Sequence, residues 1–132
     1  MKYILSVFLC FFCLNAYALE TCPSNNFLGF LSHYLNDIKA QGKWTAYPLR
    51  VTIFNPTLED SIEEKELKTI NYPVIPDSTE IQKKELEITI SSNPNEVTIV
   101  TLRGSNNGLL IKYHFLKTNN CWKLVAILDH SA

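Results

Sequence analysis

Among the side chains of this sequence that can transfer protons or bind metals, five are the strongest candidates: His33, Asp37, His114, Asp129 and His130. His33 and Asp37 are four residues apart, and on a helix that spacing brings two side chains within reach of each other. Such contact is a first requirement of general acid–base chemistry. It fits equally an exposed polar pair on a helix surface, which is the simpler interpretation. Asp129 and His130 lie near the chain end, where fraying disfavours catalysis.

The spacing of these residues does not indicate a metal site, and the sequence has no motif for a catalytic nucleophile. A zinc site needs three or four converging ligands, and the three histidines are scattered without a His-x-x-x-His pair. No nucleophile-elbow motif surrounds a serine, and residues 104–108 fit a hairpin turn better than a phosphate-binding loop. We therefore expect no catalytic residue, no metal site and no cofactor, and a non-enzymatic role.

Aromatic and basic residues are the remaining candidates for a pocket or a contact surface: Tyr34, Trp44, Tyr47, Arg50, Tyr113 and His114. Tyr34 falls on the apolar stripe of a predicted helix, which explains it as a core residue. Trp44 and Tyr47 stand near Arg50, and such residues suit protein contacts or a lid over the core. His114 alternates with apolar residues along a predicted strand, where it faces either a pocket or solvent.

Residues 1–18 have the three parts of a cleavable export signal. Lys2 precedes an apolar run over residues 4–14, and the run is followed by Ala16-Tyr17-Ala18, the small-residue pattern that signal peptidase needs. The run is well short of the roughly 20 residues that span a membrane. We expect a periplasmic or secreted domain of residues 19–132, with no membrane anchor after cleavage.

The charge balance excludes strongly charged partners. The chain has 12 basic and 13 acidic residues, and loss of Lys2 with the signal makes the domain only slightly more acidic. This balance does not favour nucleic acid or an anionic membrane surface as a partner. The length suits one domain.

Two cysteines, Cys22 and Cys121, remain after signal cleavage, because Cys10 and Cys13 lie within the signal. In an oxidising compartment, two such residues usually form one internal disulfide. A bridge across so long a loop contributes about 4–5 kcal/mol in the chain-entropy account. A reactive thiol or an intermolecular link is the alternative.

Hydrophobic periodicity predicts two helices in the first half of the mature chain. One covers residues 25–41, with Ser24 or Asn25 as its cap and Gly42 at its exit. Its apolar stripe has the spacing of one helix face and comprises Phe27, Phe30, Leu31, Tyr34, Leu35 and Ile38. The other is a short surface helix over residues 59–70, where Ser61 and Glu64 fit a capping box. Residues 48–54 favour a strand between the two helices.

The C-terminal half predicts four strands, at residues 86–91, 97–103, 109–117 and 121–129. Short turns join them, including Asn107-Gly108 and residues 118–120, which indicates an antiparallel meander. The last two strands are apolar on both faces, so they are expected at the centre of the sheet. Since the first helix must bury its stripe against this sheet, the predicted fold is α+β, an N-terminal amphipathic helix packed on a curved antiparallel sheet.

This order of elements resembles the nuclear-transport-factor-2-like cone fold, and within it the small secreted bacterial domains of unknown function. The resemblance rests on the helix motif Phe27-Leu28-x-Phe30-Leu31-x-x-Tyr34-Leu35 and on the final strand, residues 121–129, with Trp122 and Asp129. It implies a cone-shaped pocket between helix and sheet but no fixed activity.

Two functional hypotheses follow. The first is an exported non-enzymatic binding domain with an unknown ligand, including a protein partner in an immunity or inhibitor role. The second is a small-molecule-binding protein or an isomerase- or dehydratase-like enzyme, because enzymes of the resembled superfamily place an Asp or His and a Tyr in the cavity. A cavity of roughly 300 Å³ or more, lined by His114 and a tyrosine, would favour the second hypothesis.

Overall fold

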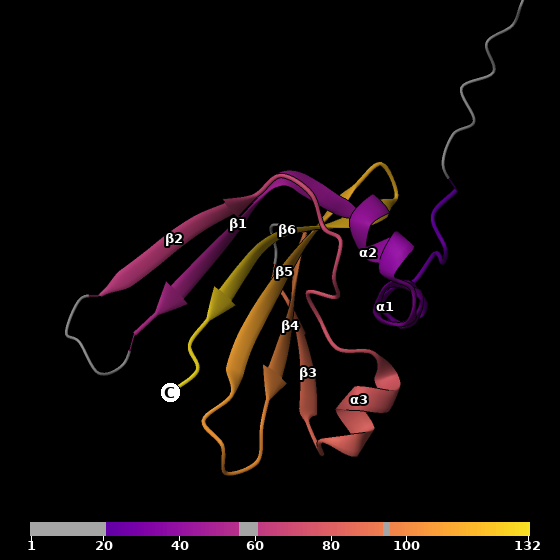
Figure 1. The fold of residues 1–132 in the computed structure, drawn as a ribbon. Helices are drawn as coiled ribbons and strands as arrows, with labels where there is room; N and C mark the ends of the chain where they lie inside the picture. The colour runs from indigo at the N-terminus through magenta and orange to yellow at the C-terminus, as the bar shows by residue number, and fades with distance from the viewer. Residues whose placement is uncertain (1–20, 56–60, 94–95) are drawn as a thin grey trace, which may run out of the picture.

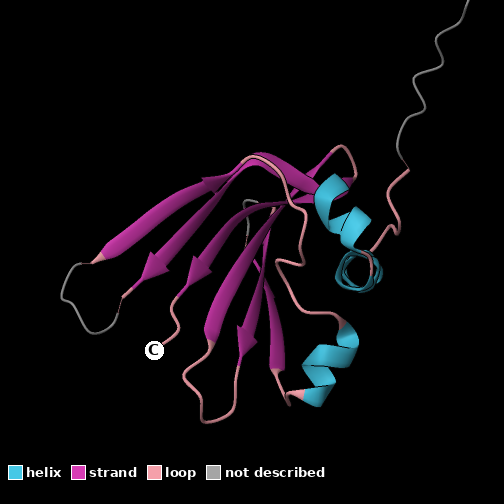
Figure 2. Cartoon of the chain, in the orientation of Figure 1, coloured by secondary structure: helices cyan, strands magenta, loops and turns pink. Residues whose placement is uncertain are grey.

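The computed structural model describes residues 21–55, 61–93 and 96–132 of the chain. The predicted export signal, residues 1–18, lies outside the described residues. The described part folds into three short helices that gather on one side of a curved six-stranded sheet (Figures 1 and 2). No helix within these ranges is long and apolar enough to cross a membrane.

The helix predicted over residues 25–41 is divided into two. Helix α1 covers Phe27–Asn36 and helix α2 covers Ile38–Lys43. Asp37 between them has an extended backbone, and its carboxylate accepts a hydrogen bond from the Lys39 N–H (2.9 Å). Aspartate favours such local bonds over helix continuation. The predicted N-cap and exit are also corrected, because Asn26 caps α1 through the Gly29 N–H and Gly42 lies inside α2.

The first strand, β1, covers Thr45–Phe54 and confirms the strand predicted at residues 48–54. The surface helix predicted over residues 59–70 is wrong in its described part. There, strand β2 covers Ile62–Leu67 and pairs antiparallel with β1. Backbone pairing with β1 outweighs the helix propensity of its Glu and Lys residues, and charged side chains suit an edge strand.

The predicted four-stranded meander is confirmed. Its strands are β3 (Glu87–Ser92), β4 (Val97–Arg103), β5 (Leu110–Thr118) and β6 (Cys121–Asp129). Each pairs antiparallel with the next. The strand order is β2-β1-β6-β5-β4-β3, which places β5 and β6 near the centre as predicted. The pairing of β1 with β6 is parallel, so the sheet is mixed and not wholly antiparallel.

A third helix, α3, covers Ser78–Lys83 and was not predicted. Asp77 caps it by accepting from the Glu80 N–H (2.8 Å). The hairpin between β5 and β6 turns at Asn119 and Asn120, which both have positive φ. That conformation is typical of the two-residue turn that matches strand twist.

The helices and the sheet enclose an aromatic core. Phe30 of α1 is fully buried, and its ring lies 5.5–6.3 Å, centre to centre, from five other aromatic rings: Phe27, Tyr34, Trp44, Phe115 and Trp122. A disulfide joins Cys22, before α1, to Cys121 at the start of β6, as predicted, with the Cα atoms 5.4 Å apart. The stripe of α1 therefore packs on the concave face of the sheet.

Candidate functional site

A strap formed by residues 73–76 crosses the concave face of the sheet. Gln41 of α2, which is 1% exposed, fixes the strap at two backbone groups. Its side-chain amide donates to the Ile75 carbonyl (3.1 Å) and its side-chain oxygen accepts from the Val74 N–H (2.9 Å). The Tyr113 hydroxyl of β5 donates to the Val74 carbonyl (3.0 Å). These three bonds hold the strap between α2 and the sheet, with Ile75 fully buried.

A cavity of about 650 Å³ lies on one side of the strap, between the three helices and the sheet. Leu35 of α1 and Leu102 of β4 belong to its apolar wall, together with Ile38, Val74, Leu86, Leu109, Ile111 and Tyr113. This volume falls in the range of pockets that hold small molecules. We refer to it as the larger cavity.

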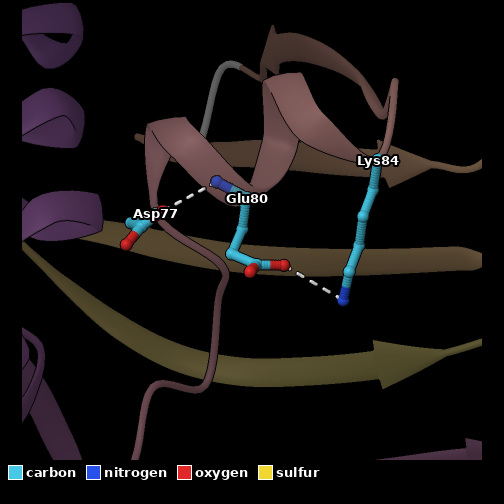
Figure 3. A network of polar contacts seen from close by, with 3 residues as sticks. All are labelled: Asp77, Glu80 and Lys84. Carbon is cyan, nitrogen blue, oxygen red and sulfur yellow. Dashed lines mark hydrogen bonds and ion pairs between the residues drawn. The ribbon is translucent and has the colours of Figure 1, made fainter.

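The polar residues at the larger cavity belong mostly to α3 and its cap. The Glu80 carboxylate forms an ion pair with the Lys84 ammonium (3.1 Å), and Asp77 caps the same helix (Figure 3). Asn36 at the end of α1 accepts from the Ser78 N–H (3.2 Å) and donates to the Ser78 hydroxyl (3.0 Å). An exposed ion pair of this kind contributes at most about 1 kcal/mol, so a ligand can compete for either charge.

A smaller cavity of about 200 Å³ lies on the other side of the strap. Its apolar wall comes from strands β1, β2, β5 and β6, and the two cavities share four wall residues: Pro73, Val74, Ile111 and Tyr113. Unlike the larger cavity, it contains one ammonium group from the sheet, Lys65, and one carboxylate, Asp129. The strap therefore divides the concave face into two cavities, whose charged side chains come from α3 and its caps in the larger one and from the sheet in the smaller one.

Two buried tyrosines lie in this part of the molecule: Tyr113 lines both cavities, and Tyr34 belongs to the aromatic core. Burial raises the pKa of Tyr113, and the negative charge of Asp129 raises it further. Burial likewise raises the pKa of Tyr34. The Thr45 hydroxyl donates to the Gln41 carbonyl (2.6 Å), so its single proton is committed and the Tyr34 hydroxyl must be the donor in their 2.9 Å contact. Both tyrosines are hydrogen-bond donors at neutral pH.

These pKa shifts predict a loss of stability in alkali. An unfolded tyrosine releases its proton near pH 10, whereas Tyr34 and Tyr113 keep theirs in the folded protein. The folded state is therefore disfavoured as pH rises above about 10, by up to about 1.4 kcal/mol per pH unit for each residue. Ultraviolet titration of phenolate should show both residues ionising only together with loss of near-ultraviolet circular dichroism. Ionisation of all tyrosines before unfolding would contradict this assignment.

Of the six candidate residues from the sequence, Tyr113 lines both cavities. Tyr34 and Trp44 are buried in the aromatic core. Tyr47 is half exposed, and its hydroxyl donates to the Gly42 carbonyl (2.7 Å). Arg50 is exposed and neighbours buried Leu49 and Val51 on β1, which places it on the opposite, convex face of the sheet.

His114 also lies on the convex face, because it follows core-facing Tyr113 on β5. It is not among the residues that line either cavity. Burial lowers the pKa of His114, and the charge of Lys112 lowers it further. The polar pair of His33 and Asp37 lines a separate hollow on the helix side, with Lys39, Lys43 and Trp44. The structure thus does not bring the histidines of the described chain to the concave cavities.

Sequence reasoning missed several residues that line the cavities. Asp129 was expected at a fraying end, but the Ser131 N–H donates to its carboxylate (2.9 Å) and the Ala132 N–H donates to the Gly108 carbonyl (2.9 Å). The tail is thereby fixed beside the β4–β5 loop. The spacing of Asp77 and Glu80, a cap followed three residues later by Glu, was the available signal for α3.

Comparison with known proteins identifies the fold. No protein-family model matches the chain, and no curated protein matches it in sequence. A solved structure that resembles it is that of an NTF2-like protein from Bacteroides fragilis, with a TM-score of 0.56 and 19% sequence identity. The match covers 81% of this chain but 47% of that protein, so this chain spans about half its length. The chain has the α+β cone fold of the nuclear-transport-factor-2-like proteins, as its first helix and final strand predicted.

Proposed function

We propose that this domain is an exported, non-enzymatic binding protein that holds a small, largely apolar molecule in the larger cavity. The observation that carries the proposal is the cavity itself, about 650 Å³ of space in a domain of this size, with apolar walls from α1, the strap and the sheet. Ligand pockets are typically such hollows, with a few polar groups that orient the ligand.

The polar groups at the larger cavity support binding more than acid–base catalysis. Asp77 is engaged as a helix cap, and Glu80 and Lys84 neutralise each other in an exposed ion pair. Tyr113 donates its proton to the Val74 carbonyl. Acid–base catalysis requires a group positioned to transfer a proton to or from the substrate, whereas these groups are engaged in structural contacts.

Export is part of the proposal because it explains the start of the chain and the Cys22–Cys121 disulfide together. Disulfides of this type persist in oxidising compartments. A protein partner in an immunity or inhibitor role stays a prediction from the sequence.

Fluorescence titration of residues 19–132 with N-phenyl-1-naphthylamine, a neutral apolar fluorophore, tests the binding role. The wild-type protein should bind it saturably. Leu86→Trp, which fills the larger cavity, should weaken binding by about tenfold or more, a loss of about 1.4 kcal/mol. The matched control is Leu28→Trp on the outer face of α1, where the side chain is 68% exposed. Absence of saturable binding, or equal weakening by both substitutions, would refute the proposal.

A further inference from the structure

The smaller cavity combines apolar walls with two opposite charges on different strands. Lys65 comes from β2 and Asp129 from β6, with β1 between them. Lys65 is opposite Val51, Val51 is opposite Ile127, and Asp129 lies two residues further along β6 on the same face. From the spacings of a sheet, the two Cα atoms are about 12 Å apart. The two charged side chains therefore line the same cavity wall at positions two strands apart.

Neither charge is neutralised by a protein partner in the described part of the chain. Asp129 accepts one hydrogen bond, from the Ser131 N–H, and forms no ion pair with the described residues. Lys65 likewise has no ion pair within those ranges. Asp129 is half-buried and Lys65 is exposed, so a ligand that enters the cavity displaces water from both groups. A charge that loses its water must gain a partner, because an unpaired buried charge is strongly unfavourable.

We propose that the smaller cavity binds a small zwitterion of the amino-acid class with an apolar side chain. The ligand carboxylate pairs with the Lys65 ammonium, and the ligand ammonium pairs with the Asp129 carboxylate. The apolar side chain packs on the wall between them, which Val51, Leu67 and Ile127 supply. A neutral molecule would leave both charges unpaired, and a singly charged one would leave one of them unpaired.

The size of the cavity limits the ligand. About 200 Å³ is below the range of pockets for drug-sized molecules, which begins at roughly 300 Å³. A single amino acid suits this volume better than a longer peptide. The larger cavity has no sheet-borne pair of opposite charges, so the two cavities select different ligand chemistry. This inference does not rest on occupancy of the larger cavity.

Calorimetric titration of residues 19–132 with L-leucine, as a probe of the class, tests the ligand chemistry. L-leucine should bind. N-acetyl-L-leucine lacks the ammonium and L-leucinamide lacks the carboxylate, so each should bind about tenfold more weakly or worse. These comparisons use the unaltered protein, so no question of folding arises. No heat of binding for L-leucine, or equal binding of all three compounds, would overturn the proposal.

Two substitutions test which protein side chain pairs with which charged group of the ligand. Asp129→Asn keeps an oxygen for the Ser131 N–H, and it should weaken L-leucine binding without affecting N-acetyl-L-leucine. Lys65→Met should weaken L-leucine without affecting L-leucinamide. Lys68→Met is the control, since Lys68 is exposed and does not line the cavity. Unchanged L-leucine binding in both site variants would refute the assignment.

The same experiments separate this proposal from the one for the larger cavity. Leu86→Trp should leave L-leucine binding unchanged, and Asp129→Asn should leave N-phenyl-1-naphthylamine binding unchanged. Loss of both ligands in either variant would contradict two separate sites. If one of the two ligands does not bind, only the proposal for its own cavity is refuted.

Discussion

Replacing Phe30 with alanine is expected to lower the free energy of unfolding by about 3–5 kcal/mol. Phe30 is fully buried and contacts five aromatic rings from α1, the C-cap of α2 and the sheet. The loss combines the transfer free energy of the ring with the cavity left at the centre of the core. Urea denaturation followed by tryptophan fluorescence measures it, because Trp44 and Trp122 lie next to the ring.

The control is Leu28→Ala on the same helix. Leu28 is two residues away and exposed, so its substitution should change stability by no more than about 0.5 kcal/mol. The comparison keeps helix propensity nearly constant and varies burial. A loss below about 1 kcal/mol for Phe30→Ala, where a buried side chain should cost several times more, would mean that α1 does not pack on the sheet as described.

Removal of the disulfide is expected to have an effect of similar size. The bridge joins residues 99 positions apart, and release of so long a loop costs about 4–5 kcal/mol in the chain-entropy account, within a usual range of about 2–5 kcal/mol. The Cys22→Ser/Cys121→Ser double variant should show this loss in urea denaturation. The physical reason is that the unfolded chain regains freedom that the bridge removed.

Chemical reduction of the disulfide tests the same stabilising effect without a substitution. A thiol reductant should destabilise the wild-type protein to the level of the double variant and leave the double variant unchanged. If reductant has no effect on wild-type stability, the two cysteines are not linked in the protein.

The parts of the fold that could be predicted are those with strong local periodicity. The stripe of α1 and the alternation of β4, β5 and β6 each repeat over several residues, so the pattern outweighs single exceptions. The break at Asp37 was not predictable from that pattern, because one side-chain hydrogen bond decides it. Strand β2 could not be found either, since its Glu and Lys residues favour a helix and only pairing with β1 makes it a strand.

The cavities were less predictable than the fold for a related reason. Their walls come from segments that are far apart in the sequence, and the strap is positioned by Gln41, a residue with no motif around it. The sequence identified Tyr113 as a candidate, but strand alternation alone could not say which face of β5 would be concave. For the same reason, the sequence could not show that Arg50 and His114 would lie on the convex face.

The proposal that the larger cavity is a ligand site can be tested by following backbone amide chemical shifts while N-phenyl-1-naphthylamine is titrated into isotope-labelled protein. Shifts should concentrate at Val74, Leu86, Leu102 and Leu109, around the larger cavity. Shifts centred instead on the convex face near His114, or an absence of saturable shifts, would contradict a ligand site between α1, α3 and the sheet.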